Sequence, residues 1–108
     1  MLTGDIPTEF GMMSALAELD LHINGLNGAI PTEVGLLADT ELLWLDMNSL
    51  TGTIPTEIGK LSALYNLKLS ENRLNQTIPT EVGFLTNMQT LDFHNNMLSG
   101  LFPRKSYL

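Results

Sequence analysis

The chain has 108 residues, about the size of one domain, and its 44% apolar content is enough for a hydrophobic core. Twelve acidic against five basic residues give a net charge of −7, which repels phosphate groups and argues against nucleic acid or anionic membrane as a partner. The lack of cysteine excludes disulfides, a thiol nucleophile and a thiolate metal site, and no segment reads as a signal peptide or membrane span.

A proline-centred segment recurs every 24 residues. It reads Ile-Pro-Thr-Glu, then an apolar residue and glycine, around Pro7, Pro31, Pro55 and Pro79, with a degraded copy around Pro103. A fixed period of this length predicts a solenoid, in which each turn buries apolar side chains against its neighbours. We therefore predict one domain over 1–108, with a partial repeat over 1–11, full repeats over about 12–35, 36–59 and 60–83, and a last repeat over 84–108 that is degraded at its end.

The first half of each repeat predicts a strand and a turn. Leucines two apart, such as Leu19 and Leu21, point to the same side of a strand and leave the residues between them facing outward. An asparagine follows where the chain must turn, and its amide both donates and accepts hydrogen bonds that turning backbone needs. The four turn asparagines are Asn24, Asn48, Asn72 and Asn96.

The second half of each repeat predicts a bend and a short helical segment. Glycines such as Gly28 suit the bend, and each proline suits the first helical position. A threonine that could cap the segment and a glutamate that favours its amino end come next, and a glycine is expected to end it. The apolar residues expected in this half of the core are Val34, Leu37, Ile58, Leu61, Val82 and Leu85. Thr40 and Gln76 depart from the repeat pattern.

Together these residues spell L-x-x-L-x-L-x-x-N-x-L-x-G-x-I-P, which resembles the plant-type leucine-rich repeat of receptor-like kinases and receptor-like proteins. The resemblance covers essentially the whole chain. It implies an α/β solenoid of about four and a half turns, with short parallel strands on a concave face and 3₁₀ or irregular segments on a convex face. It also implies a stacked ladder formed by the turn asparagines and an extracellular or cell-surface location, although the sequence itself leaves the compartment unknown.

The outward strand positions differ from turn to turn while the scaffold residues stay fixed, which is typical of a recognition surface. Trp44 is the only tryptophan, and we expect it to stand exposed beside Leu42 as an interface anchor. The predicted ligand-binding residues are Glu18, Asp20, His22, Leu42, Trp44, Asp46, Asn66, Lys68, Ser70, Thr90, Asp92 and His94.

We expect no catalytic residue, no cofactor and no metal site, and therefore no enzyme. His22 and His94 lie three turns apart and cannot share a metal ion. Asp46 is expected to contact His22 from the next turn, but no serine or cysteine completes a catalytic group. The column of glutamates supplies a straight line, whereas calcium needs converging oxygens.

The main functional prediction is a non-catalytic module that binds a protein or peptide through its concave face. One alternative is a truncated stretch of a longer repeat array without independent activity, whose uncapped ends could associate end to end. A second alternative is ice or surface binding through the threonine and asparagine rows. Asn75-Gln76-Thr77 is a glycosylation acceptor pattern, which is used only if the chain is secreted.

Overall fold

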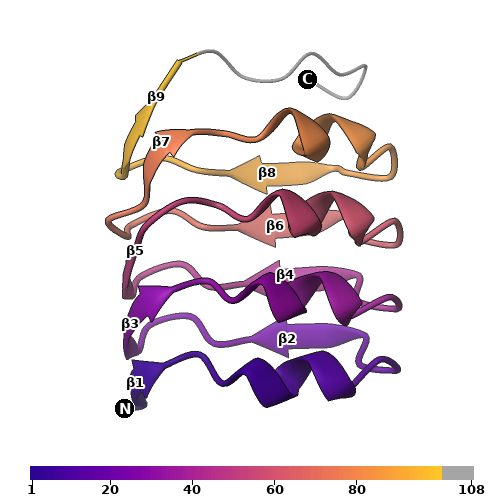
Figure 1. Cartoon of the computed structure of the whole chain (residues 1–108), viewed down its shortest axis with the longest axis horizontal. Helices are drawn as coiled ribbons and strands as arrows, with labels where there is room; N and C mark the ends of the chain where they lie inside the picture. The colour runs from indigo at the N-terminus through magenta and orange to yellow at the C-terminus, as the bar shows by residue number, and fades with distance from the viewer. Residues whose placement is uncertain (101–108) are drawn as a thin grey trace.

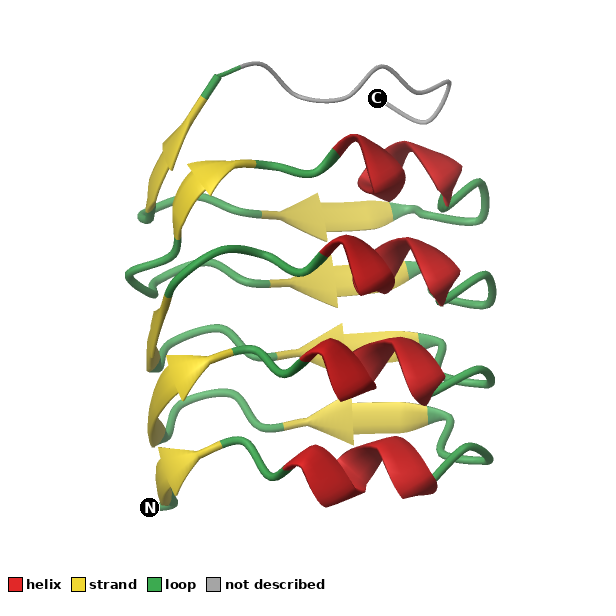
Figure 2. Ribbon diagram, in the orientation of Figure 1, coloured by secondary structure: helices red, strands yellow, loops and turns green. Residues whose placement is uncertain are grey.

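The computed structural model describes residues 1–100, which form a stack of similar turns (Figure 1). Each of the three complete turns carries a short strand on one side, a second short strand after the asparagine turn, and a 3₁₀ segment on the opposite side (Figure 2). The fold is the predicted leucine-rich repeat solenoid. The last positions of the repeat pattern, Phe102 and Pro103, lie outside the described residues.

The principal sheet contains one strand from each successive turn. Its strands are β2 (Glu18–Asp20), β4 (Leu42–Trp44), β6 (Asn66–Lys68) and β8 (Thr90–Asp92), in the order β2-β4-β6-β8. All neighbours are parallel, and the register pairs Leu19 with Leu43, Leu43 with Leu67 and Leu67 with Leu91. Equivalent residues of successive repeats therefore stand side by side, and each outward position forms a column across the sheet.

A second row of strands follows the asparagine turns, and the sequence did not predict it. These strands are β1 (Thr3–Asp5), β3 (Gly25–Ala29), β5 (Ser49–Thr51), β7 (Asn75–Thr77) and β9 (Met97–Ser99). They pair as β1-β3-β5 and β7-β9. Between the two groups, the N–H groups of Arg73 and Asn75 donate to Leu50 and Gly52 at 2.8 and 2.9 Å, so hydrogen bonding continues along the stack. Only β3 and β5 carry a buried leucine, and β1 and β7 carry no leucine at all, so the apolar pattern of these short strands does not reveal such a row.

The 3₁₀ segments begin differently from the prediction. They are η1 (Thr8–Met12), η2 (Thr32–Leu36), η3 (Thr56–Lys60) and η4 (Thr80–Phe84). Each proline is the residue before the segment, with extended backbone such as φ −67° and ψ 141° at Pro55, and not the first helical residue. The expected threonine caps are also absent, since Thr56 Oγ1 instead lies 3.4 Å from Glu57 Oε1. The acidic residue in each first turn is present as predicted.

The glycines of the 3₁₀ segments lie inside these segments and do not end them, which corrects a second prediction. A Cβ placed on Gly35 would stand 2.8 Å from the Glu57 backbone oxygen, and one on Gly59 would stand 2.7 Å from that of Glu81. Real Cβ atoms essentially never approach so closely. Glycine is therefore required because the 3₁₀ segment of the next turn packs directly against it.

The core runs through the middle of every turn. The six apolar residues predicted for the convex half are all buried, with at most 5% of their surface exposed. Thr40 replaces a leucine and is fully buried, yet its hydroxyl donates to the Leu16 carbonyl at 2.8 Å. That bond allows a polar side chain in an apolar column.

The turn asparagines link neighbouring turns through the backbone. Asn72 is 8% exposed, and its Nδ2 donates to the carbonyls of Leu45, Leu69 and Ser70 at 2.9, 3.2 and 3.2 Å. Its Oδ1 accepts the N–H of Leu50 at 2.9 Å. The equivalent bonds recur at Asn48 and Asn96. Each such side chain therefore satisfies buried backbone groups of two turns.

Gln76 occupies a repeat position at which the backbone is left-handed and the other turns have glycine. Its φ is +65°, while Gly28 and Gly52 adopt +74° and +78° at the same place in their turns. A side chain at positive φ costs about 1–2 kcal/mol, of which glycine's extra unfolded-state entropy offsets part. We expect Gln76→Gly to raise the free energy of unfolding by about 0.5–1 kcal/mol in chemical denaturation. Thr77→Gly, in the adjacent exposed strand position, should lower it instead, and a loss with Gln76→Gly would contradict the strain argument.

Candidate binding face

The concave face is defined here as the solvent side of the sheet β2-β4-β6-β8 and of the residues that directly follow its strands. The register brings the twelve predicted ligand-binding residues together on it in columns. The exposed members are Glu18, Asp20, Thr90 and His94, and the half-buried members are His22, Leu42, Trp44, Asp46, Asn66, Lys68 and Asp92. Ser70 is only 4% exposed and therefore offers little surface to a ligand.

Trp44 lies near the middle of this face. It is half-buried, whereas the sequence predicted that it would be exposed. Its indole Nε1–H donates to Asn66 Oδ1 at 2.9 Å. The Lys68 ammonium stands 4.3 Å from the centre of the ring, and the His22 ring meets it edge-on with centroids 5.7 Å apart. These neighbours fix the orientation of the indole, which is the state expected of a preorganised anchor.

Two aspartate–histidine pairs flank Trp44 on either side. His22 Nδ1 contacts Asp20 Oδ1, and His94 Nδ1 contacts Asp92 Oδ1. The predicted contact between His22 and Asp46 is wrong, because the aspartate two residues earlier on the same strand side is within easier reach. Desolvation raises the pKa of Asp20, but hydrogen bonds from the His22 side chain and backbone, together with the charges of His22 and Lys68, outweigh it and hold the pKa below its usual value.

Asp46 differs from the other carboxylates of this face because one of its oxygens is buried without a hydrogen-bond partner. Its Oδ1 is buried and accepts no hydrogen bond, and within residues 1–100 neither oxygen forms an ion pair. Its neighbour in the next turn, Ser70, directs its hydroxyl toward Asp92 Oδ2 at 3.4 Å. An acceptor that has lost water without gaining a donor is unfavourable, so Asp46 needs an explanation.

The concave face extends one column beyond the sequence prediction. Ile23 and Met47 follow the outward columns and are 61% and 49% exposed. Their backbones have φ of +54° and +58°, which is rare for a β-branched residue such as isoleucine. The only signal available in the sequence was an apolar residue directly before Asn24 and Asn48, at a position the core does not require.

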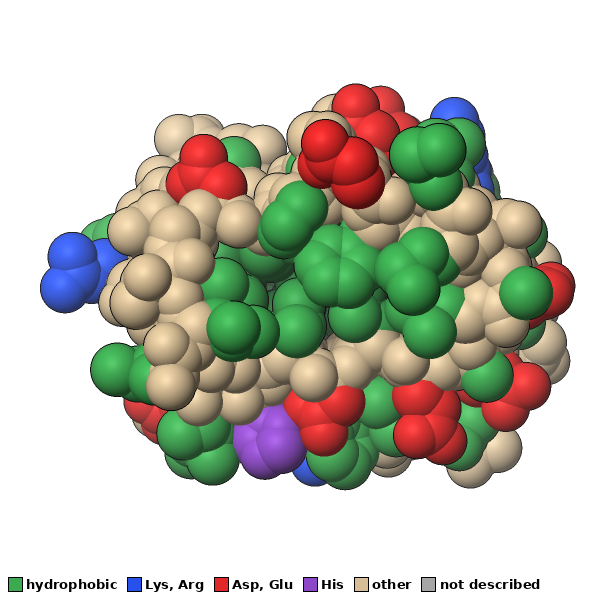
Figure 3. Space-filling model, turned by 90° about the horizontal axis from the view of Figure 1, so that it is seen from below, with side chains coloured by type: hydrophobic (Ala, Val, Ile, Leu, Met, Phe, Trp, Pro, Cys, Tyr) green, Lys and Arg blue, Asp and Glu red, His purple; other side chains and the backbone are tan. Residues whose placement is uncertain are grey.

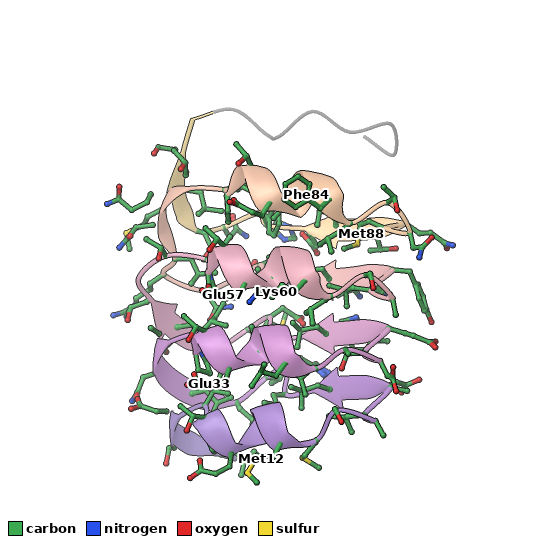
Figure 4. All side chains as sticks on the ribbon, turned by 45° about the vertical axis from the view of Figure 1, so that its right-hand side comes forward. Met12, Glu33, Glu57, Lys60, Phe84 and Met88 are labelled. Carbon is green, nitrogen blue, oxygen red and sulfur yellow. The ribbon has the colours of Figure 1, made fainter. Side chains whose placement is uncertain are left out.

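The opposite side of the solenoid presents the 3₁₀ segments (Figure 4). Met12 and Phe84 occupy equivalent positions on it and are 83% and 65% exposed, with Lys60 in the same column. Met88, by contrast, is 3% exposed and belongs to the core. Glu33 and Glu57 lie at the starts of their segments, in the single column expected from the sequence.

The amino-terminal end of the stack exposes apolar side chains, seen in the middle of Figure 3 with acidic side chains around them. Leu2, Pro7, Phe10, Leu21 and Leu26 line a hollow there of about 270 Å³. This surface is the one available at that end for the predicted end-to-end association, which stays a prediction.

Other candidate features are few in residues 1–100. No group of three or more histidine or acidic residues is arranged to hold a metal ion there, and no helix in that part is long and apolar enough to cross a membrane. Asn75 lies on β7, half-buried, and its side-chain amide makes no hydrogen bond with the described residues. Its glycosylation stays a prediction.

Comparison with known proteins gives one family and one fold. The family described as Leucine Rich Repeat matches residues 40–61 and 87–105. A TDR receptor structure is 38% identical with a TM-score of 0.92, over 94% of this chain and 18% of that one. The Arabidopsis receptor kinase HAESA, in complex with the peptide hormone IDA and the co-receptor SERK1, is 36% identical with a TM-score of 0.89, over 94% and 17%.

A plant ice-binding protein is 36% identical with a TM-score of 0.86, over 90% of this chain and 32% of that one. No curated protein sequence gives a significant match. The chain thus spans less than a fifth of the two receptor chains and about a third of the ice-binding protein.

Proposed function

Because the chain is built of leucine-rich repeats and shares the fold of plant receptor ectodomains, we propose that it is a non-catalytic module that binds a protein or peptide on its concave face. The observation that carries the proposal is the contrast between a fixed scaffold and a varied outer face with Trp44 near its middle. The HAESA structure, which holds a peptide hormone and a co-receptor, supports a ligand of this class.

The geometry of the face suits such a ligand. Short parallel strands present outward columns one strand spacing apart, on a backbone held by the asparagine ladder. Rigid, half-buried aromatic residues supply a large share of binding energy at protein interfaces because they bury apolar area at little entropic cost. Leu42, on the same strand as Trp44, adds apolar surface next to it.

The test is selection of a displayed random dodecapeptide library on the purified chain, followed by affinity measurements with synthetic copies of the selected peptides. We expect Trp44→Leu to weaken binding at least tenfold, because loss of a central anchor costs about 2 kcal/mol or more. Phe84→Leu, an aromatic change on the convex side, is the matched control and should leave the affinity within twofold. Both variants should keep the thermal melt of the parent chain.

Peptides that bind both variants equally would place the ligand elsewhere. If no peptide is selected at all, the result favours the alternative that the chain is a purely structural stretch of repeats.

A second candidate function is ice binding, which the match to a plant ice-binding protein favours. The second row of strands carries exposed small polar residues, among which Asn27 pairs with Ser49 and Thr77 with Ser99 across neighbouring strands, and Thr3 and Thr51 are exposed as well. Thr56 and its equivalents lie within 3.4 Å of glutamate carboxylates, so their hydroxyls are less free to contact a lattice. An ice-recrystallisation assay separates the two functions, because Thr51→Lys should abolish inhibition of recrystallisation and Trp44→Leu should not.

A further inference from the structure

Trp44 and Asp46 form a site that is favourable for a positive charge. They are two residues apart on one extended segment. Its backbone is hydrogen-bonded to the next turn, because the Leu45 N–H donates to the Lys68 carbonyl at 2.9 Å and the Met47 N–H to the Ser70 carbonyl at 3.0 Å. Their side chains therefore leave the same side of the segment about 7 Å apart. An aromatic face next to an unpaired carboxylate attracts a cation through both the ring quadrupole and the charge.

Lys68 now occupies half of this site. Its ammonium lies over the Trp44 ring, and within residues 1–100 it forms no ion pair with a carboxylate. Lysine has a flexible stem of four carbons, so it can leave the ring at small cost. Asp92 stands beside it in the same column, one strand away, and can receive the displaced ammonium.

The charge of the whole face points the same way. Its predicted contact residues include four carboxylates, from Glu18, Asp20, Asp46 and Asp92, against the single ammonium of Lys68. His22 and His94 are already in contact with Asp20 and Asp92. A peptide with positive charge is therefore complementary to this face, whereas an acidic one is repelled.

We infer that the concave face binds a peptide through an arginine or lysine side chain that replaces Lys68 on the Trp44 ring and pairs with Asp46. This inference rests on the proposed function and names the chemistry of its ligand. The ligand's cation would balance the charge of the half-buried Asp46 carboxylate, which forms no ion pair within residues 1–100, and this makes the carboxylate a positive contributor to affinity and not a cost. An arginine fits best, because its planar guanidinium can stack on the indole and present N–H groups to the carboxylate at its edge.

The experiment uses peptides selected from the random dodecapeptide library that lose binding to Trp44→Leu. We expect them to share a basic residue. Asp46→Asn should weaken their binding about tenfold, because the amide oxygen can still accept a hydrogen bond but the negative charge that attracts the cation is gone. Asp39→Asn removes the same charge from an exposed loop residue off the concave face and should leave the affinity within twofold.

Lys68→Met provides the most discriminating result. We expect it to tighten binding about threefold, because the competitor for the ring is removed. Exchange of the peptide's basic residue for glutamine should weaken binding clearly less in Asp46→Asn than in the parent chain, and this difference in a double-mutant cycle measures the coupling between the two groups.

Two outcomes overturn this inference while the proposed function survives. One is a set of peptides that depend on Trp44 but carry no basic residue, and the other is weaker binding to Lys68→Met, which would make Lys68 itself a ligand contact. If no selected peptide depends on Trp44, both the inference and the concave-face proposal fail.

Discussion

Asn72→Ala is expected to lower the free energy of unfolding by about 3–5 kcal/mol, the largest effect of any single change considered. The substitution removes three hydrogen bonds donated by the side-chain amide and the one it accepts from Leu50 N–H. These partners are backbone groups of two turns, and leaving a buried donor or acceptor unpaired costs about 1–3 kcal/mol. Because repeats are stabilised mainly by their neighbours, loss at a central turn should also broaden the transition.

Chemical denaturation followed by circular dichroism measures this effect, and two asparagine variants are its controls. Asn24→Ala should cost clearly less, because the Asn24 amide donates only to carbonyls of its own turn, at Leu21 and His22, and its Oδ1 accepts the N–H of the exposed Leu2 at 2.8 Å, where water can replace it. Asn27→Ala, at an exposed position without a side-chain hydrogen bond, should stay within about 0.5 kcal/mol. Equal losses at Asn72 and Asn27 would show that the ladder does not stabilise the stack.

The second large effect is expected at Gly59. An added Cβ would stand 2.7 Å from both the Cβ and the backbone oxygen of Glu81, so η3 and η4 must move apart to admit it. Overpacking of this kind costs about 1–3 kcal/mol, and here the obstacle includes backbone, which cannot rotate away as a side chain can. We expect Gly59→Ala to lose about 3 kcal/mol of unfolding free energy.

The matched control for that variant is Gly25→Ala. An added Cβ there meets its nearest atoms, Leu2 O and a Thr3 methyl, at 3.3 Å, so a small shift suffices. Its loss should remain below about 1 kcal/mol. A Gly59→Ala protein as stable as the parent would contradict the close stacking of the 3₁₀ segments.

The parts of the fold that could be predicted are those on which the period imposes a residue type. Paired leucines such as Leu43 and Leu45 specify the strand and its inward side, and the 24-residue spacing aligns each column of outward residues. The role of Gly59 could not be read in this way. A glycine after a short helical segment has the same sequence signature whether it caps the segment or admits a neighbour, and only the stacking distance decides between them.

The candidate site was predictable as a set of columns but not as a set of contacts. The register places Asp46 next to His22, yet His22 turns to Asp20 on its own strand. Trp44 was expected to be free, whereas Lys68, His22 and Asn66 surround it. The neighbour that a side chain contacts depends on its rotamer and on competition among several charged groups. The order of residues in a column gives no information on either.

Amide chemical shifts of the isotope-labelled chain, mapped during titration with a selected peptide, reveal whether the ligand binds on the concave face. We expect shifts concentrated on β2, β4, β6 and β8, with the Trp44 indole Nε1–H among the largest. Shifts concentrated on the 3₁₀ segments or on β1, β3 and β5, with the Trp44 indole unmoved, would contradict it.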